Sequence, residues 1–238
     1  MLQQNRSMKK YIPFLTLGFL LFFSTLTAQF NEKPILNIEN EDKKFLNWGY
    51  YLGFNQYDFK FEYKDDINDL DNNQVLKNFG FNVGLIGEMN INEFLDIRLE
   101  PGLFYTQRDV GFLNTSYIAQ VKSTYISVPL LLKVSTRRIG NWKPFIIGGV
   151  SYALNLGSNE KSLDDNESGT FRMTTGNYAY ELGFGLDFYT EYFKFTPSIR
   201  GVFGLNDELV KDNDPNSPYT GNIESMKTRG IFVNFTFE

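Results

Sequence analysis

Apolar and polar residues alternate along most of the chain after residue 45. The clearest example is residues 193–205, where the odd positions are apolar residues or glycine and the even positions include lysine, threonine, serine and arginine. A period of two places successive side chains on opposite faces of a β-strand. This pattern therefore predicts a long strand with one apolar face and one polar face.

Eight segments are predicted strands: four carry this pattern clearly, and residues 48–63, 79–90 and 124–136 carry it less regularly. The eight segments span residues 48–63, 79–90, 94–111, 124–136, 143–156, 177–190, 193–205 and 227–238. Residues 143–156 are apolar on both faces, so their orientation stays open. All eight exceed the about five or six residues of an ordinary strand and reach the roughly 9–11 residues that a strand needs to cross a bilayer. Their length favours strands that span a membrane.

The connections between these segments alternate between short and long. The short ones are residues 91–93, residues 137–142 and the few residues around 191, and the long ones are residues 64–78, 112–123, 157–176 and 206–226. Three of the long connections are rich in Asp, Asn and Ser, which predicts solvated, irregular loops. The alternation predicts an all-β fold, an eight-stranded antiparallel up-and-down transmembrane β-barrel with short periplasmic turns and longer extracellular loops.

The apolar face of such a sheet needs a partner. No amphipathic helical segment of useful length follows the N-terminal region. If the sheet closes with its apolar face outward, lipid covers that face, and closure leaves no strand edge unpaired. The alternative is a soluble lipocalin-like or sandwich protein with the apolar face inside, because eight strands also suit those folds.

The polar face would then line the barrel. An eight-stranded barrel is just wide enough for side chains to fill it. Five acidic and five basic residues occupy inward positions: Glu88, Asp96, Glu100, Glu181 and Asp187, with Arg98, Arg108, Lys133, Lys194 and Arg200. Unpaired charges would be costly there. We therefore expect a cross-linked polar plug and no open channel.

Aromatic residues concentrate near the ends of the predicted strands. The set is Trp48, Tyr50, Tyr178, Tyr180, Tyr189, Tyr192 and Phe193. Such residues form girdles at the two membrane interfaces of outer-membrane barrels. They are also good strand formers, so a place in a packed core is the other interpretation.

The N-terminal region has the layout of an export signal. Lysines at positions 9 and 10 precede an uncharged apolar stretch over residues 11–26, and small residues precede a cleavage point after residue 28. This predicts a signal peptide over residues 1–28, with residues 1–7 as a possible start artefact; the alternative is an N-terminal membrane anchor. Residues 29–45 would then be a short periplasmic segment, either docked on a partner or, as we favour, a disordered lead-in. Residues 46–238 would form the barrel, in the outer membrane of a Gram-negative bacterium.

Composition excludes several kinds of chemistry. The chain contains no cysteine and no histidine, which removes disulfides, thiolate nucleophiles, histidine-based catalysis and ordinary zinc sites. A net charge of -5 argues against nucleic-acid binding. The calcium-loop-like spacings at residues 69–73 and 212–216 lack the required Gly and Glu. We expect no enzyme, no cofactor, no metal and no small-molecule substrate.

Four segments resemble one family of outer-membrane barrels. They are KKFLNWGYYLGFNQYDF (residues 43–59), LEPGLFYTQRDVGF (99–112), YISVPLLLKV (125–134) and KPFIIGGVSYALNLG (143–157). Over residues 43–237 the chain resembles the PorT family. PGL and VPLLLK recur in many exported eight-stranded barrels, so the opening segment is the more specific part. One departure is Glu238 after Phe237, because barrel-assembly signals usually end on the aromatic residue.

The resemblance implies a role in protein export. The PorT family is implicated in the type IX secretion system, which moves folded cargo across the outer membrane and serves gliding motility in some hosts. The implied protein is a non-enzymatic accessory or assembly component, with outer-membrane lipid and other secretion-machinery proteins as partners. The alternative is a surface barrel for adhesion or envelope protection that acts through its long loops.

Overall fold

The computed structural model describes residues 36–64, 74–111, 118–162, 165–166, 171–215, 217 and 219–238. The chain divides into two compact units, Met1–Leu36 and Asn37–Glu238. The predicted signal peptide over residues 1–28 lies outside the described residues. Among those residues, no helix is both long enough and apolar enough to cross a membrane.

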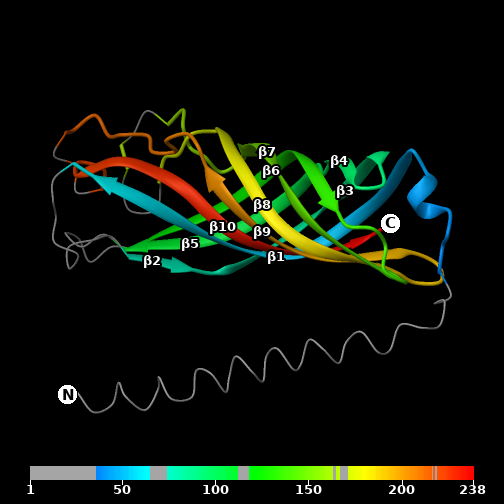
Figure 1. The fold of residues 1–238 in the computed structure, drawn as a ribbon. Helices are drawn as coiled ribbons and strands as arrows, with labels where there is room; N and C mark the ends of the chain where they lie inside the picture. The colour runs from blue at the N-terminus through cyan, green and yellow to red at the C-terminus, as the bar shows by residue number, and fades with distance from the viewer. Residues whose placement is uncertain are drawn as a thin grey trace, which may run out of the picture. The chain divides into compact units, whose positions relative to one another are not determined.

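Strands are the main elements of the described part of the second unit (Figure 1). A 3-10 turn, η2 (Glu41–Lys43), precedes them. In the described part of the chain the strands are β1 (Leu46–Tyr63), β2 (Gln74–Lys77), β3 (Phe79–Asn92), β4 (Leu95–Leu99), β5 (Gly102–Gly111), β6 (Ile118–Ser135), β7 (Trp142–Asn155), β8 (Gly176–Tyr189), β9 (Lys194–Gly204) and β10 (Ile223–Phe237).

These ten described strands form eight wall segments. β4 and β5 both pair with β3 on one side and β6 on the other, so they are one predicted strand interrupted at Glu100 and Pro101. Proline has no N–H for the ladder, which accounts for a break at this point. β2 continues the line of β3 along β5. The prediction of eight long antiparallel segments is confirmed.

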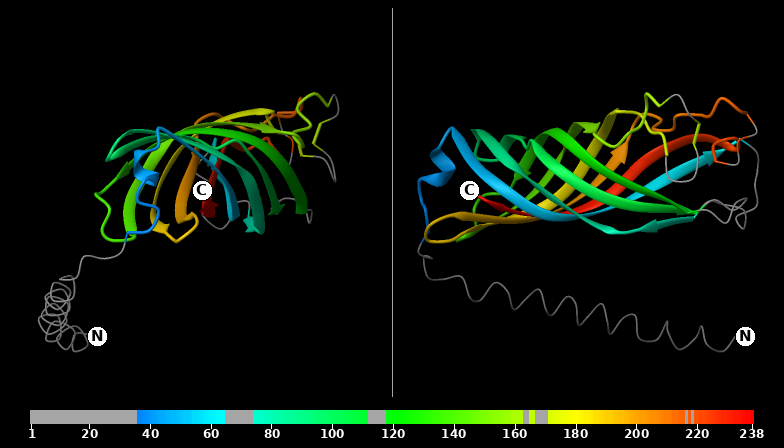
Figure 2. Two further views of the ribbon diagram at one scale, coloured as in Figure 1. Left: turned by 90° about the vertical axis from the view of Figure 1, so that its right-hand side faces the viewer. Right: turned by 180° about the vertical axis from the view of Figure 1, so that it is seen from behind.

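The sheet closes into a barrel because β1 pairs with both β10 and β3. Its register includes Tyr50 opposite Phe237 on β10 and opposite Leu85 on β3. The remaining neighbours follow chain order, and every pairing is antiparallel. The strands run obliquely around the barrel (Figure 2). Over the closed part of the wall, lipid therefore meets no unpaired backbone edge.

The tight turns lie at one end of the barrel, and the strands that precede the long connections end at the other (Figure 1). The connections β3–β4, β6–β7 and β8–β9 are at one end, together with the start of β1 and the end of β10. The strands β1, β5, β7 and β9, which precede the long connections, terminate at the other end. In outer-membrane barrels the short turns are periplasmic and the long loops extracellular. We use these names for the two ends below.

The outer wall is apolar and the interior is polar. On β8, Leu182 and Phe184 are 63% and 60% exposed, whereas Glu181 and Asp187 are 3% and 0% exposed. On β7, whose orientation the sequence left open, Ile146 faces outward at 61% exposure. A soluble lipocalin-like protein or sandwich needs the opposite arrangement, so that alternative is wrong.

Candidate functional site

The periplasmic half of the interior holds a network of ion pairs centred on Glu88. Its carboxylate lies 2.8 Å from Lys194 Nζ, 3.1 Å from Lys133 Nζ and 3.3 Å from Arg98 Nε. Lys133 Nζ also lies 2.8 Å from Asp187 Oδ2. The side chains of these residues are at most 3% exposed. Residues from β3, β4, β6, β8 and β9 therefore meet at the centre of the barrel.

A second level continues this network toward the extracellular end. Arg98 Nε lies 3.2 Å from Glu100, and Arg200 Nη1 lies 2.8 Å from Glu100 and 3.4 Å from Glu181. Asp96 is a looser member, 4.0 Å from Lys133 Nζ. Nine of the ten residues predicted to point inward thus belong to one connected set.

Arg108, the tenth residue, is buried but lies apart from the other nine. Its guanidinium donates to the Tyr125 hydroxyl at 2.7 Å and to Thr228 Oγ1 at 3.1 Å. It also stacks 3.8 Å above the centre of the Phe59 ring. Hydrogen bonds and an aromatic face stabilise this charge, and no carboxylate of the described residues lies within salt-bridge distance of it.

Glu238 joins the network although it was not among the predicted residues. Its side chain is fully buried, lies 3.3 Å from Arg98 Nη2 and forms an ion pair with Lys194. The alternation on β10 could have identified it, because Asn234 and Thr236 point inward and position 238 continues their parity. With Glu238 included and Arg108 apart, the network has six carboxylates and four cations.

Little space remains between the network and Arg108. A cavity of about 30 Å³ lies there, among Tyr57, Phe104, Tyr125 and Glu181. A single water needs about 10–15 Å³ on this measure, so the cavity has room for about two. This cavity is therefore too small for a solute much larger than water.

The N-terminal segment packs against the periplasmic end of the barrel. The Asp42 carboxylate accepts a hydrogen bond from the Tyr189 hydroxyl at 2.6 Å and lies 3.4 Å from Arg138 and 3.5 Å from Lys143. Asn37 donates to the Tyr189 carbonyl at 3.0 Å. Burial raises the pKa of Asp42, but the Tyr189 hydroxyl and the two cations outweigh it and hold that pKa below its ordinary value. The expectation of a disordered lead-in is therefore wrong from Asn37 onward.

Tyr189 also corrects the predicted aromatic girdle. Its side chain is buried beneath Asp42 and does not face lipid. The reason is parity: Tyr178 and Tyr180 point outward from β8, so the odd position 189 points inward. The other predicted girdle residues are exposed, namely Trp48, Tyr50, Tyr178, Tyr180, Tyr192 and Phe193.

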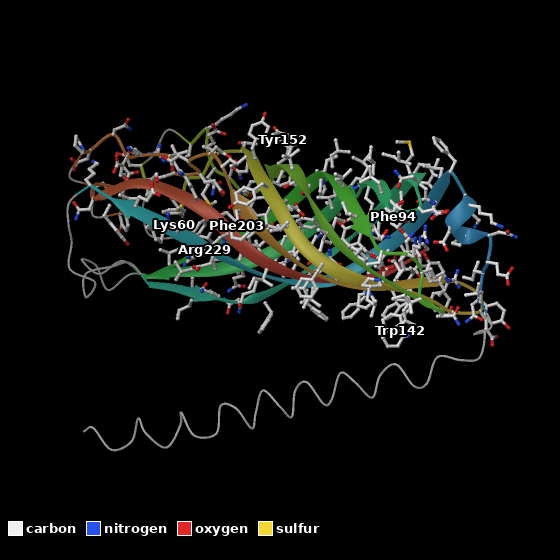
Figure 3. All side chains as sticks on the ribbon, in the orientation of Figure 1. Lys60, Phe94, Trp142, Tyr152, Phe203 and Arg229 are labelled. Carbon is white, nitrogen blue, oxygen red and sulfur yellow. The ribbon has the colours of Figure 1, made fainter. Side chains whose placement is uncertain are left out.

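Further aromatic residues complete two belts on the outer wall. Toward the turns, Trp142 packs against Phe188 with ring centroids 5.1 Å apart. Toward the loops, Tyr152 packs against Tyr178 and Phe203 against Tyr180, each at 5.0 Å. Figure 3 shows Trp142 nearer the turn end and Tyr152 and Phe203 nearer the loop end. Trp142, Tyr152 and Phe203 occupy outward positions of their strands, so alternation alone could have added them to the predicted girdle.

The extracellular loops carry a buried apolar cluster. Phe171, Met173 and Leu209 pack with Phe59 and with other residues at the loop ends of the strands. Met173 and Leu209 also form an antiparallel bridge between two loops. We call Phe171, Met173 and Leu209 the loop cap. The prediction that the loops are solvated and irregular is wrong for these three residues.

Asp212 anchors the loop cap by polar contacts. It lies 3.0 Å from Arg172 Nη2 and accepts hydrogen bonds from the Thr220 hydroxyl at 2.9 Å and the Asn166 N–H at 2.9 Å. Burial raises the pKa of Asp212, but these donors and the Ser217 hydroxyl outweigh it and hold that pKa below its ordinary value. Asp212 is the first residue of the calcium-loop-like spacing at residues 212–216, and its carboxylate is bound by hydrogen-bond donors of the protein.

Comparison with known proteins agrees with this architecture. Residues 27–210 match the family described as outer membrane protein beta-barrel domain. No protein of curated function matches the sequence.

Several solved structures match at low sequence identity. OprG from Pseudomonas aeruginosa is 15% identical, with 80% of this chain and 94% of that chain covered and a TM-score of 0.47. Neisserial surface protein A is 9% identical, with 81% and 98% covered and a TM-score of 0.43. Ail from Yersinia pestis is 13% identical, with 80% and 96% covered and a TM-score of 0.35. At these values the matches have no bearing on function.

The family match covers most of the chain, including the greater part of the barrel wall. The apolar outer wall, the polar interior and the closed antiparallel sheet are the properties that an outer-membrane location requires. The chain therefore belongs to the outer membrane protein beta-barrel domain family.

Proposed function

We propose that this protein is an accessory or assembly component of the type IX protein secretion system that acts through protein contacts and not as a conduit. The observation that carries the proposal is the interior, where buried ion pairs from five strands cross the lumen and the adjoining cavity measures about 30 Å³. A barrel with such an interior can bind partners through its surfaces but cannot conduct cargo through its lumen. The resemblance of the opening strand to the PorT family supports the secretion role.

The periplasmic end is the surface we expect a secretion partner to contact. Asn37, Asp42 and Tyr189 hold the N-terminal segment against the barrel there. Arg137, Glu93 and their neighbours on the turns remain exposed, with side chains 80% and 76% accessible for these two. A partner that binds an ordered segment loses less conformational entropy on binding than one that must first order the segment.

Deletion of the gene tests this proposal. Cargo proteins of the secretion system should then accumulate in the periplasm, while resistance to detergents and large antibiotics stays unchanged. Complementation with the wild-type gene should restore export. Normal export in the deletion strain, or large steady conductance of the purified protein in planar bilayers, would contradict the proposal.

A second candidate is a surface barrel for adhesion or envelope protection. The observation that favours it is the loop cap, which Asp212 and Arg172 anchor at the extracellular end. Replacement of the exposed Lys161 and Lys211 by glutamate alters that surface without touching the buried cluster. Loss of adhesion or of serum resistance with normal cargo export would support this candidate over the secretion role.

A further inference from the structure

A groove on the outer wall lies near the extracellular end, between β1, β2, β9 and β10. Figure 3 labels three of the residues around it, Lys60, Phe203 and Arg229. The groove has a volume of about 240 Å³, and Gln56, Asp58, Lys77, Phe203, Arg229 and Ile231 line it. It combines an apolar side with a charged side.

Two strands separate beside the groove. Gln56 opposite Phe79 is the last residue pair that joins β1 to β3. Farther toward the loops, in the described part of the chain, β1 stays paired with β10, and β2 pairs with β5. The ion pair between Lys77 and Asp58, at 3.0 Å, spans the separation.

One carboxylate holds two cations at the edge of the groove. Arg229 Nη2 and Lys77 Nζ lie 2.7 Å and 3.0 Å from the same oxygen, Oδ2 of Asp58. The Asp58 side chain is only 10% exposed, whereas those of Arg229 and Lys77 are 52% and 44% exposed. Guanidinium and ammonium groups have five and three N–H donors, so donors remain for an external anion.

Further lysines give this region a positive charge. Lys60 lies directly opposite Lys227 across β1 and β10, and Glu62 lies 3.2 Å from Lys60. The region thus has four cations (Lys60, Lys77, Lys227 and Arg229) and two carboxylates (Asp58 and Glu62). Its net charge is +2, whereas the net charge of the chain is -5. Like charges directly opposite each other are unfavourable, and a bound anion would relieve that repulsion.

The groove lies where the apolar wall ends. Phe54 and Ile231, one step toward the membrane, are exposed apolar residues, and Phe203 lies opposite Arg229 on β9. This boundary corresponds to the head groups of the outer leaflet. Arginine and lysine at that level bind phosphate, with arginine able to do so in a bidentate manner.

We propose that this groove binds the phosphorylated head group of an outer-leaflet lipid. Arg229, Lys77 and Lys60 contact the phosphate, and an acyl chain of the same molecule runs down the wall over Phe203 and Ile231. Asp58 holds the two nearest cations in place for the anion.

Lipid titration of the full-length mature protein tests the proposal. The protein is purified in a nonionic detergent, and bound lipid is counted by native mass spectrometry with bisphosphorylated lipid A or its dephosphorylated form as the probe. The phosphorylated lipid should bind about tenfold tighter or more, because each basic residue at this level adds to the attraction. Substitutions K60Q, K77Q and R229Q together should abolish this preference.

Matched variants keep the result interpretable. K122Q removes an exposed lysine on β6, away from the groove, and should leave binding unchanged. If the triple variant does not fold, K60Q with K77Q keeps the pair of Asp58 with Arg229 and should weaken binding about threefold or more. Equal binding of both lipids, unchanged binding by the folded variant, or displacement of the lipid by millimolar inorganic phosphate would overturn the proposal.

Discussion

Replacement of Arg200 by methionine should destabilise the barrel more than replacement of Glu88 by glutamine. Methionine keeps most of the length of arginine but removes its charge. Among the described residues, Arg200 is the only cation within salt-bridge distance of Glu181, while Glu100 retains Arg98. The substitution therefore leaves one buried carboxylate without a cation.

The structure gives a magnitude for each change. An uncompensated buried charge costs about 3–5 kcal/mol, which we expect for Arg200→Met. In Glu88→Gln, every cation keeps another carboxylate: Lys133 keeps Asp187, and Lys194 and Arg98 keep Glu238. The loss is then that of charged hydrogen bonds, about 1.5–3 kcal/mol. The excess of carboxylates over cations makes the network more sensitive to loss of a cation.

Urea unfolding of the protein in detergent micelles measures both free energies. Glu93→Gln is the control, because its ion pair with Arg137 is exposed and 3.8 Å long, so it should have no measurable effect. Bilayer conductance should stay at background for all variants. A loss for Arg200→Met equal to or smaller than that for Glu88→Gln would refute the reasoning from charge balance.

Three further predictions concern the two ends and the wall. Tyr189→Phe removes a hydrogen bond to the ionised Asp42 and should cost about 1.5–3 kcal/mol, with faster proteolysis of the N-terminal segment; unchanged proteolysis would contradict this. The folded-state pKa of Asp212 is below its ordinary 3.8, so its pair with Arg172 stabilises the protein above that pH and is lost as the pH falls through the folded-state pKa. The difference in free energy of unfolding between wild type and Arg172→Ala should be smaller at that acidic pH than at neutral pH. The same difference at both pH values would contradict the assignment. Leu182→Arg, on the exposed apolar wall, should cost about 2–4 kcal/mol in urea unfolding in a bilayer, while a cost near zero would place that position outside the membrane.

Alternation along the strands made the wall and its inward residues predictable. Because side chains on a strand alternate strictly, the parity of Glu88, Lys133 and Arg200 could be read without coordinates. Parity also corrects the prediction for Tyr189, whose odd position on β8 places its side chain inside the barrel although it lies near a strand end. The partners of each charge depend on register between strands distant in sequence, as for Glu88 and Lys194.

The two ends of the barrel were less predictable, for a physical reason. Phe171, Met173 and Leu209 lie in partly apolar stretches of the polar loops that are too short to show a strand or helix period. Their cluster forms because separate loops meet over the strands. The segment from Asn37 is polar and resembles a disordered lead-in, yet side-chain hydrogen bonds, not apolar burial, hold it in place.

The ion pairs of Glu88 also determine how the barrel responds to force. Glu88 on β3 contacts Lys133 on β6 and Lys194 on β9, which lie on different sides of the wall. These contacts join strands that are not neighbours in the wall, so they oppose flattening under lateral membrane pressure. A pull on β3 by an attached partner would therefore be transmitted directly to β6 and β9.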